Sequence, residues 1–278
     1  IRMYEPQRIA QALESRKPGE LKKGDKLMII ACDHPARGAL GAGSDDMAMA
    51  SRIDVLERCV EALSRPGVNG FLGTADMIED LTLLGALDGK LVYGSMNRVG
   101  LRGSKFEMDD QFNCYDPDGI EKARLDGGKT LTRICLEDPA TANTLKATAD
   151  AINAMSDRGL VTMIEPFMSK WVDGSVVNDL TPDAVIKSMA IASGLGRTSA
   201  YTWLKLPCVD DMERVMEAAT LPSLILGGEV SKDADVTLEK WHVALQQPNV
   251  FGLVIGRSLL FPTDGDVTKA VDNTVELL

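Results

Sequence analysis

The sequence contains few of the residues that build zinc centres and disulfide frameworks. It has two histidines, His34 and His242, and an odd number of cysteines, five, without a Cys-x-x-Cys pair. A zinc site needs several nitrogen or sulfur ligands, and two distant histidines do not supply them. Scattered cysteines that form no obvious pairs are typical of reduced thiols, so we expect a cytoplasmic protein.

The sequence also lacks a surplus of basic residues and long apolar runs. The formal net charge is −11, and no basic cluster stands out, so we expect no nucleic-acid partner. No apolar run approaches the roughly 18 residues of a membrane span. The first twenty residues are charged and lack the apolar core of a signal peptide, so no membrane partner is expected either.

Eight short apolar runs alternate with amphipathic helical patterns along the chain. Such runs are typical of parallel strands whose outer face is covered by helices. An open dinucleotide-binding sheet is disfavoured because no Gly-x-Gly-x-x-Gly follows an early strand. The pattern predicts an α/β protein, a (β/α)8 TIM barrel forming a single domain over 1–278, with a helical N-terminal extension at 1–25. The predicted strands are 26–33, 68–74, 90–96, 129–136, 160–166, 201–207, 222–228 and 250–256.

Ionisable residues lie at the carboxyl ends of several predicted strands, where barrel enzymes place their active sites. Asp33 ends the first strand, Glu165 ends the fifth, and Lys205 lies in the sixth within YTWLKLPCV. Side chains alternate between the two faces of a strand, and the purely aliphatic face should meet the helices. We therefore expect one amine and two carboxylates to converge inside the barrel mouth.

A structural interpretation competes with the catalytic one, because buried ion-pair networks also perturb pKa values. The position of the three groups at the correct ends of three strands favours catalysis. Lys129 and Lys90 begin strands, at the opposite end of the barrel, and we expect them to be solvated surface charges. The longest irregular connection, 97–117, follows the third strand and is predicted to act as a lid.

A lysine removed from water has a lowered pKa, so part of it is a neutral amine that attacks carbonyl carbon. The resulting Schiff base withdraws electrons and promotes cleavage of the adjacent carbon–carbon bond, which is class I aldolase chemistry and needs no cofactor or metal. In this interpretation Lys205 is the nucleophile, and Glu165 and Asp33 transfer protons.

The turns after the seventh and eighth strands have the composition of a phosphate site. Barrels of this kind often bind phosphate there, because backbone N–H groups of glycine can approach it closely. The alternative is that the glycines only close tight turns, and Glu229 would add an unfavourable negative charge. With His34, the predicted substrate-binding set is Gly227, Gly228, Gly256, Arg257 and Ser258.

The motifs ACDHP, MIEPF, WLKLP and the turns GG and IGR together resemble the DeoC/LacD-type class I aldolases over roughly 27–261. The longer stretches ACDHPARGALG, LGALDGKLVYGSMNR and LGRTSAYTWLKLP resemble one bacterial (β/α)8 subgroup associated with inositol catabolism. That resemblance implies cleavage of 6-phospho-5-dehydro-2-deoxy-gluconate to dihydroxyacetone phosphate and malonate semialdehyde. It also implies a homo-oligomer.

The sequence departs from this family in two places. Arg133 stands on the fourth strand where the tagatose relatives have lysine, and arginine does not readily give up a proton. We therefore expect Arg133 to bind an oxyanion or a substrate carboxylate within the active site. The tyrosine acid of the archaeal relatives has no counterpart on the fifth strand, so the proton donor is left unassigned.

Two alternatives stay open at this point. Asp33, Glu137 and Glu165 supply the oxygen ligands that Mg²⁺ or Mn²⁺ prefers, as in a metal-dependent lyase or isomerase. The chain could also be a barrel that binds a sugar phosphate without turning it over.

Overall fold

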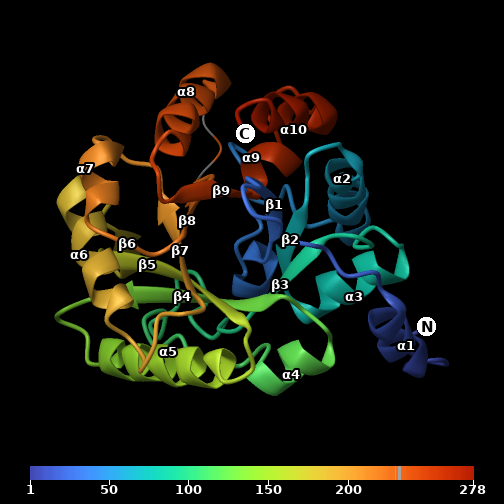
Figure 1. Cartoon of the computed structure of the whole chain (residues 1–278), viewed down its shortest axis with the longest axis horizontal. Helices are drawn as coiled ribbons and strands as arrows, with labels where there is room; N and C mark the ends of the chain where they lie inside the picture. Colours follow the sequence, from blue (N-terminus) through green and yellow to red (C-terminus); the bar gives the residue numbers. More distant parts are fainter. Residues whose placement is uncertain (229, 231–232) are drawn as a thin grey trace.

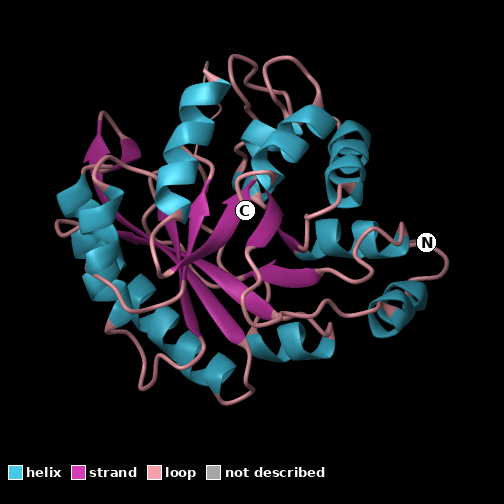
Figure 2. Ribbon diagram, turned by 45° about the horizontal axis from the view of Figure 1, so that its top comes forward, coloured by secondary structure: helices cyan, strands magenta, loops and turns pink. Residues whose placement is uncertain are grey.

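The computed structural model describes residues 1–228, 230 and 233–278, and within them eight parallel strands close into a barrel (Figures 1 and 2). Neighbouring strands pair in parallel around the ring, and β4 pairs with β5 to close it. The predicted (β/α)8 barrel is therefore confirmed. Its strands are β1 (Leu27–Cys32), β2 (Gly70–Gly73), β3 (Leu91–Ser95), β4 (Gly127–Ile134), β5 (Val161–Val172), β7 (Thr202–Pro207), β8 (Ser223–Leu226) and β9 (Val250–Ile255).

Helices form the outer layer of the barrel (Figure 2). Several begin at the caps expected for their sequence: Ser51 accepts a hydrogen bond from the Asp54 amide, and Thr181 accepts one from Ala184. No helix among the described residues is long and apolar enough to cross a bilayer. The outer helices are α2 (Arg52–Ser64), α3 (Ala75–Leu83), α4 (Pro117–Lys122), α5 (Ala140–Ser156), α6 (Pro182–Ser193), α7 (Met212–Glu217), α8 (Ala234–Leu245) and α10 (Val267–Val275).

Strand alternation divides the apolar residues into two clusters. The smaller cluster fills the barrel interior and includes Leu27, Ile29 and Ala31 of β1, whereas the larger lies between strands and helices. In β7, Leu204 belongs to the outer cluster, and Trp203 packs against the inner one. The faces predicted from alternation are therefore confirmed, and the residues that share the face of Ala31 or Trp203 point inward.

One local feature departs from the predicted strands. β5 continues past the barrel to Val172 and pairs antiparallel with β6 (Ser175–Asn178). Asp173 and Gly174 form the turn with φ values of 50° and 78°. An Asp-Gly pair between apolar runs is a strong hairpin signal, because both positions of this turn need positive φ. The sequence interpretation ended this strand at Pro166 and missed the hairpin.

The N-terminal extension carries α1 (Gln7–Ser15), which lies beside α3 at the edge of the molecule (Figure 1). The residue that follows α1 anchors it: the buried Arg16 side chain donates to the carbonyls of Lys90 at 3.0 Å and Arg124 at 2.5 Å. Because Lys90 immediately precedes β3, the extension is fixed at the amino-terminal side of the barrel, away from the carboxyl ends.

Candidate active site

Lys205 lies inside the barrel, as predicted, with 4% of its surface exposed. Its Nζ donates to Oε1 of Glu165 at 2.6 Å, across the neighbouring strands β7 and β5. Glu165 is the fifth residue of β5 and is also buried. The first two members of the predicted cluster therefore meet directly.

Lys129 completes a second ion pair with Glu165, and its predicted position on the surface is wrong. Its side chain is 3% exposed, and its Nζ contacts Oε2 of Glu165 and Oδ2 of Asp33, the latter at 3.3 Å. β4 begins at Gly127, two residues earlier than predicted, so Lys129 lies within the strand on its inner face. Its flexible four-carbon stem then carries the ammonium to the other charges. Lys90, in contrast, is half-buried and donates to the Val68 carbonyl at 2.5 Å.

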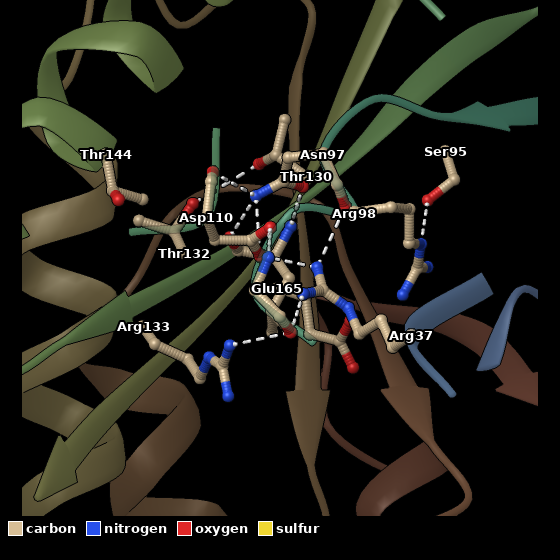
Figure 3. A network of polar contacts seen from close by, with 12 residues as sticks. Arg37, Ser95, Asn97, Arg98, Asp110, Thr130, Thr132, Arg133, Thr144 and Glu165 are labelled. Atoms are coloured by element: carbon tan, nitrogen blue, oxygen red, sulfur yellow. Dashed lines mark hydrogen bonds and ion pairs between the residues drawn. The ribbon is translucent and has the colours of Figure 1, made fainter. Parts of the chain in front are cut away.

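Basic and hydroxyl side chains from β3, from the segment after it and from β4 contact Asp33. The Ser95 hydroxyl donates to Oδ2 at 3.3 Å, and Arg98 forms an ion pair with the same oxygen. Arg98 is itself oriented by Ser95, to which its Nε donates at 2.8 Å (Figure 3). Sequence reasoning missed both residues; the available signal was their position at and just after the end of β3.

Burial and charge oppose each other in this cluster. Burial lowers the pKa of Lys205 and of Lys129, although Glu165 raises both. Burial would raise the pKa of Glu165, but the two ammonium groups outweigh it and hold this pKa well below its usual range. Burial lowers the pKa of Arg98 to about 10, so this residue stays charged at neutral pH. The carboxylate is thus firmly ionised, while the amines are easier to deprotonate than lysines in water.

The predicted substrate ligand His34 lies beside this cluster. It begins η1 (His34–Arg37), the 3-10 turn after β1, and its Nδ1 is 3.6 Å from Oδ1 of Asp33. Burial, followed by the charges of Arg257, Lys205 and Lys129, lowers the pKa of His34 well below its ordinary value. The imidazole is therefore neutral at physiological pH.

Arg133 takes part in a different network, which holds the 97–117 segment. Its Nη1 donates to Oε1 of Glu107 at 2.6 Å, and its Nη2 donates to the Glu107 carbonyl at 2.6 Å. Arg37 and Asn97 likewise bind Asp110 (Figure 3). Both ion pairs are buried, so the segment predicted to be a lid is attached to the barrel at two points. The anion-binding role of Arg133 stays a prediction.

The predicted phosphate turns have structural reasons for their glycines. Gly228 has φ of 68°, and a Cβ on Gly256 would lie 2.4 Å from the Ala31 carbonyl oxygen. Ser258, in the short helix α9 (Arg257–Leu260), has a buried Oγ that makes no hydrogen bond to any residue of the described chain. Glu229, expected to oppose phosphate, lies outside the described residues.

The structure does not bring the alternative metal ligands together. Glu137 is exposed, whereas Asp33 and Glu165 are buried and already paired with cations. Within the described parts of the chain, no three His, Cys, Asp or Glu side chains are grouped so that they could hold a metal ion. The predicted Asp33–Glu137–Glu165 set is therefore wrong as a metal site.

Known proteins place this chain in a family. The family model described as Cgl0159-like matches residues 25–275. The chain belongs to the Cgl0159-like family. The crystal structure of Cgl0159 from Corynebacterium glutamicum is 54% identical to it, and the match covers 99% of this chain and 93% of that one with a TM-score of 0.97. No curated protein matches the chain.

More distant solved structures share the barrel of this Cgl0159-like chain. A Schiff base-forming fructose-1,6-bisphosphate aldolase is 18% identical over 97% of this chain and 99% of its own, with a TM-score of 0.67. The fructose-bisphosphate aldolase from Slackia heliotrinireducens is 13% identical over 98% and 91%, with a TM-score of 0.63. At this identity the likeness shows the fold alone.

Proposed function

We propose that the protein is a class I aldolase, a carbon–carbon lyase that acts through a Schiff base on Lys205. The observation that carries the proposal is the buried Nζ of Lys205, held 2.6 Å from a carboxylate oxygen of Glu165 inside the barrel. Burial lowers its pKa and supplies the neutral amine that attacks carbonyl carbon. The shared barrel of the Schiff base-forming aldolase supports this interpretation as an analogy of fold.

In the proposed reaction, the Lys205 amine adds to the carbonyl carbon of a keto sugar to give a carbinolamine. Loss of water gives a protonated Schiff base. A base then removes the proton of the hydroxyl group next to the bond being broken. The carbon–carbon bond breaks, its electron pair forms the carbon–carbon double bond of an enamine, the iminium π pair moves to nitrogen, and an aldehyde leaves. A proton returned to the enamine carbon restores the Schiff base. Glu165 and Asp33 are proposed to serve these proton transfers, and water finally releases the ketone from Lys205.

The amine of Lys205, rather than that of Lys129, is proposed as the nucleophile. Lys129 contacts two carboxylates, Asp33 and Glu165, whereas the ion pair of Lys205 is with Glu165. Burial lowers the pKa of both amines, and that of Lys129 further than that of Lys205. The assignment to Lys205 therefore rests on its motif, WLKLP, which resembles the Schiff-base strand of the class I aldolases, and Lys129 is proposed to bind anionic groups near the Schiff base.

The substrate proposed is a phosphorylated keto sugar or keto sugar acid. With Lys205 as the neutral amine, the cluster still holds two basic side chains, Arg98 and Lys129, beside the carboxylates of Asp33 and Glu165. These basic side chains inside the barrel are proposed to attract an anion, although the whole chain is acidic. The sequence resemblance to the inositol-associated subgroup makes 6-phospho-5-dehydro-2-deoxy-gluconate the first compound to test.

Two sites are proposed to bind the substrate's anionic groups. The phosphate binds at the turns after β8 and β9, supported by the buried Ser258 hydroxyl, which makes no hydrogen bond within the described chain. Arg98 and the predicted ligand Arg133 are the candidates for a carboxylate. The proposed phosphate turn residues are Gly227, Gly228, Gly256, Arg257 and Ser258. Homo-oligomer formation and a cytoplasmic location stay predictions.

Borohydride reduction tests the proposal. The protein is incubated with dihydroxyacetone phosphate, reduced, digested and examined by mass spectrometry. A covalent adduct on Lys205 supports the Schiff base. No adduct with this ketone, or with ketones released from a panel of phosphorylated keto acids, would contradict it. Thermal stabilisation by the same compounds without any turnover would instead favour a barrel that only binds sugar phosphates.

A further inference from the structure

Most carboxylate oxygens of the cluster already contact cationic or hydroxyl side chains. Oε1 and Oε2 of Glu165 each pair with a lysine ammonium. Oδ2 of Asp33 faces Ser95, Lys129 and Arg98. A carboxylate that receives several cationic and hydroxyl donors is a weak base, because those donors favour its ionised form. Oδ1 of Asp33 is the remaining oxygen, and it faces His34.

The His34 ring lies next to this oxygen, in the turn that follows the carboxyl end of β1. Its Nδ1 is buried, makes no hydrogen bond to any described residue, and lies 3.6 Å from Oδ1 of Asp33. The side chain as a whole is 31% exposed, whereas that of Asp33 is 2% exposed. The Nδ1 edge of the imidazole thus lies beside a carboxylate, while the side chain keeps an exposed part for contact with a substrate.

The surroundings of His34 place it near the reacting lysine and keep it neutral. The charges that act on its pKa come from four separate elements, and the Asp33 carboxylate faces the ring from the same loop. Burial has the largest effect and lowers this pKa, the cations lower it further, and one carboxylate opposes them. A neutral imidazole accepts a proton, so the ring has the form that a base requires. These charged groups are Lys129 of β4, Glu165 of β5, Lys205 of β7 and Arg257 of α9.

We propose that His34, paired with the Asp33 carboxylate, is the group that moves the proton during carbon–carbon cleavage and enamine protonation. The inference rests on the proposed aldolase function and assigns this one proton transfer to His34 in place of Glu165 and Asp33. The two carboxylates keep the proton transfers of carbinolamine formation and dehydration. His34 takes the substrate hydroxyl proton, forming an N–H bond while the O–H and C–C bonds break. The electron pair of the C–C bond forms the C=C bond of an enamine, the C=N π pair moves to the iminium nitrogen, and the aldehyde is released.

The same proton then completes the cycle. The imidazolium returns it to the enamine carbon, the electron pair forms the new C–H bond, and the Schiff base is restored for hydrolysis. No further reactant than water is needed. Asp33 acts through His34: its Oδ1 lies 3.6 Å from Nδ1, where its negative charge stabilises the imidazolium.

Proton exchange separates this step from Schiff-base formation. Dihydroxyacetone phosphate bound to Lys205 loses and regains a proton at the carbon next to its carbonyl, so in D₂O it gains deuterium there. We compare wild type, His34→Gln and His242→Gln, the last being an exposed histidine of α8 that serves as control. Each variant is measured twice, by borohydride trapping and by deuterium incorporation followed with NMR.

The expected result is that His34→Gln still traps on Lys205 but exchanges its proton ~100-fold or more slowly than wild type. His242→Gln should match wild type in both measurements. In addition, wild-type exchange should fall at low pH as His34 becomes protonated, and the residual exchange of His34→Gln should lack this dependence. A residue that only shaped the site would not divide trapping from exchange in this way.

The other outcomes are equally informative. Normal trapping and normal exchange in His34→Gln would overturn the role of His34 and leave the aldolase proposal intact. Loss of both in a variant whose circular dichroism and melting temperature match wild type would show that His34 binds substrate instead. If His34→Gln does not fold, His34→Asn provides the same comparison. No trapping by the wild type would overturn the aldolase proposal and this inference together.

Discussion

Lys205 and Glu165 lie on adjacent strands of the barrel and are joined by a hydrogen bond of 2.6 Å from Nζ to Oε1. Both side chains are buried, and an isolated charge in the interior is energetically costly. Each residue therefore serves as the counter-charge of the other. The pair leaves the amine near a carboxylate that stays ionised, with Lys129 on its other oxygen.

Substitution of the two buried lysines should have different effects on the borohydride adduct. Lys205→Met should abolish the adduct with dihydroxyacetone phosphate, because the nucleophilic nitrogen is lost. Lys129→Met should keep an adduct on Lys205. Lys146→Met, at a side chain that is 76% exposed, serves as the control and should behave as wild type. An adduct located on Lys129 by peptide mass spectrometry would contradict the assignment.

Glu165→Gln should move the pH dependence of trapping to lower pH. Glu165 raises the pKa of Lys205, so removal of its negative charge lowers that pKa and leaves more neutral amine at a given pH. The measurement is the rate of borohydride trapping between pH 5 and pH 10, and the midpoint of this profile should fall. Asp150→Asn, at an exposed position in α5, is the control. A midpoint that moves to higher pH would contradict this expectation, because it would show that Glu165 does not raise the pKa of Lys205.

Arg133→Met should destabilise the protein through the 97–117 segment. Breaking the buried ion pair leaves Glu107 without its cation, which costs about 3–5 kcal/mol in free energy of unfolding. Glu107→Gln should also destabilise the protein. The double variant should lose less stability than the two single variants added together, because the two residues form one ion pair. Urea unfolding and limited proteolysis within 97–117 measure these effects. A raised KM with unchanged stability would instead support the predicted anion-binding role of Arg133.

Ser258→Ala should weaken the binding of a phosphorylated ketone without loss of stability. The Ser258 hydroxyl has no hydrogen-bond partner among the described residues, so its removal breaks no internal bond. We expect about tenfold weaker binding, equivalent to roughly 1.4 kcal/mol, for one hydrogen bond to phosphate. Calorimetric titration with dihydroxyacetone phosphate measures it, and dihydroxyacetone, which lacks the phosphate, is the matched control. Equal losses for both ligands would place Ser258 away from the phosphate.

Some of the candidate site was predictable because strand alternation is a local property. Each inward position of a strand is fixed by its own sequence, since successive side chains point to opposite faces. Ala31 and Trp203 were therefore assigned to the correct face from sequence, and with them the inward direction of Asp33 and Lys205. The Asp173-Gly174 hairpin was also present as a sequence signal, although the strand prediction did not include it.

Other parts of the site depend on distances that no short stretch encodes. The prediction for Lys129 was wrong because its strand begins two residues earlier than predicted. Its long side chain also reaches Glu165, which is distant in sequence. Arg98 reaches Asp33 only through the path that the chain takes after β3. Arg133 pairs with Glu107 because the 97–117 segment folds back onto the barrel.

The sequence by itself determined the eight strands, their inward faces and the presence of an amine and two carboxylates at one end of a barrel. The tertiary structure alone decided which charges meet, because ion pairs form between strands that are far apart along the chain. It also decided the exposure of each group, since removal from water depends on how all the surrounding elements pack. The neighbouring charges and the burial of each group together set the protonation states of Lys205, Glu165 and His34.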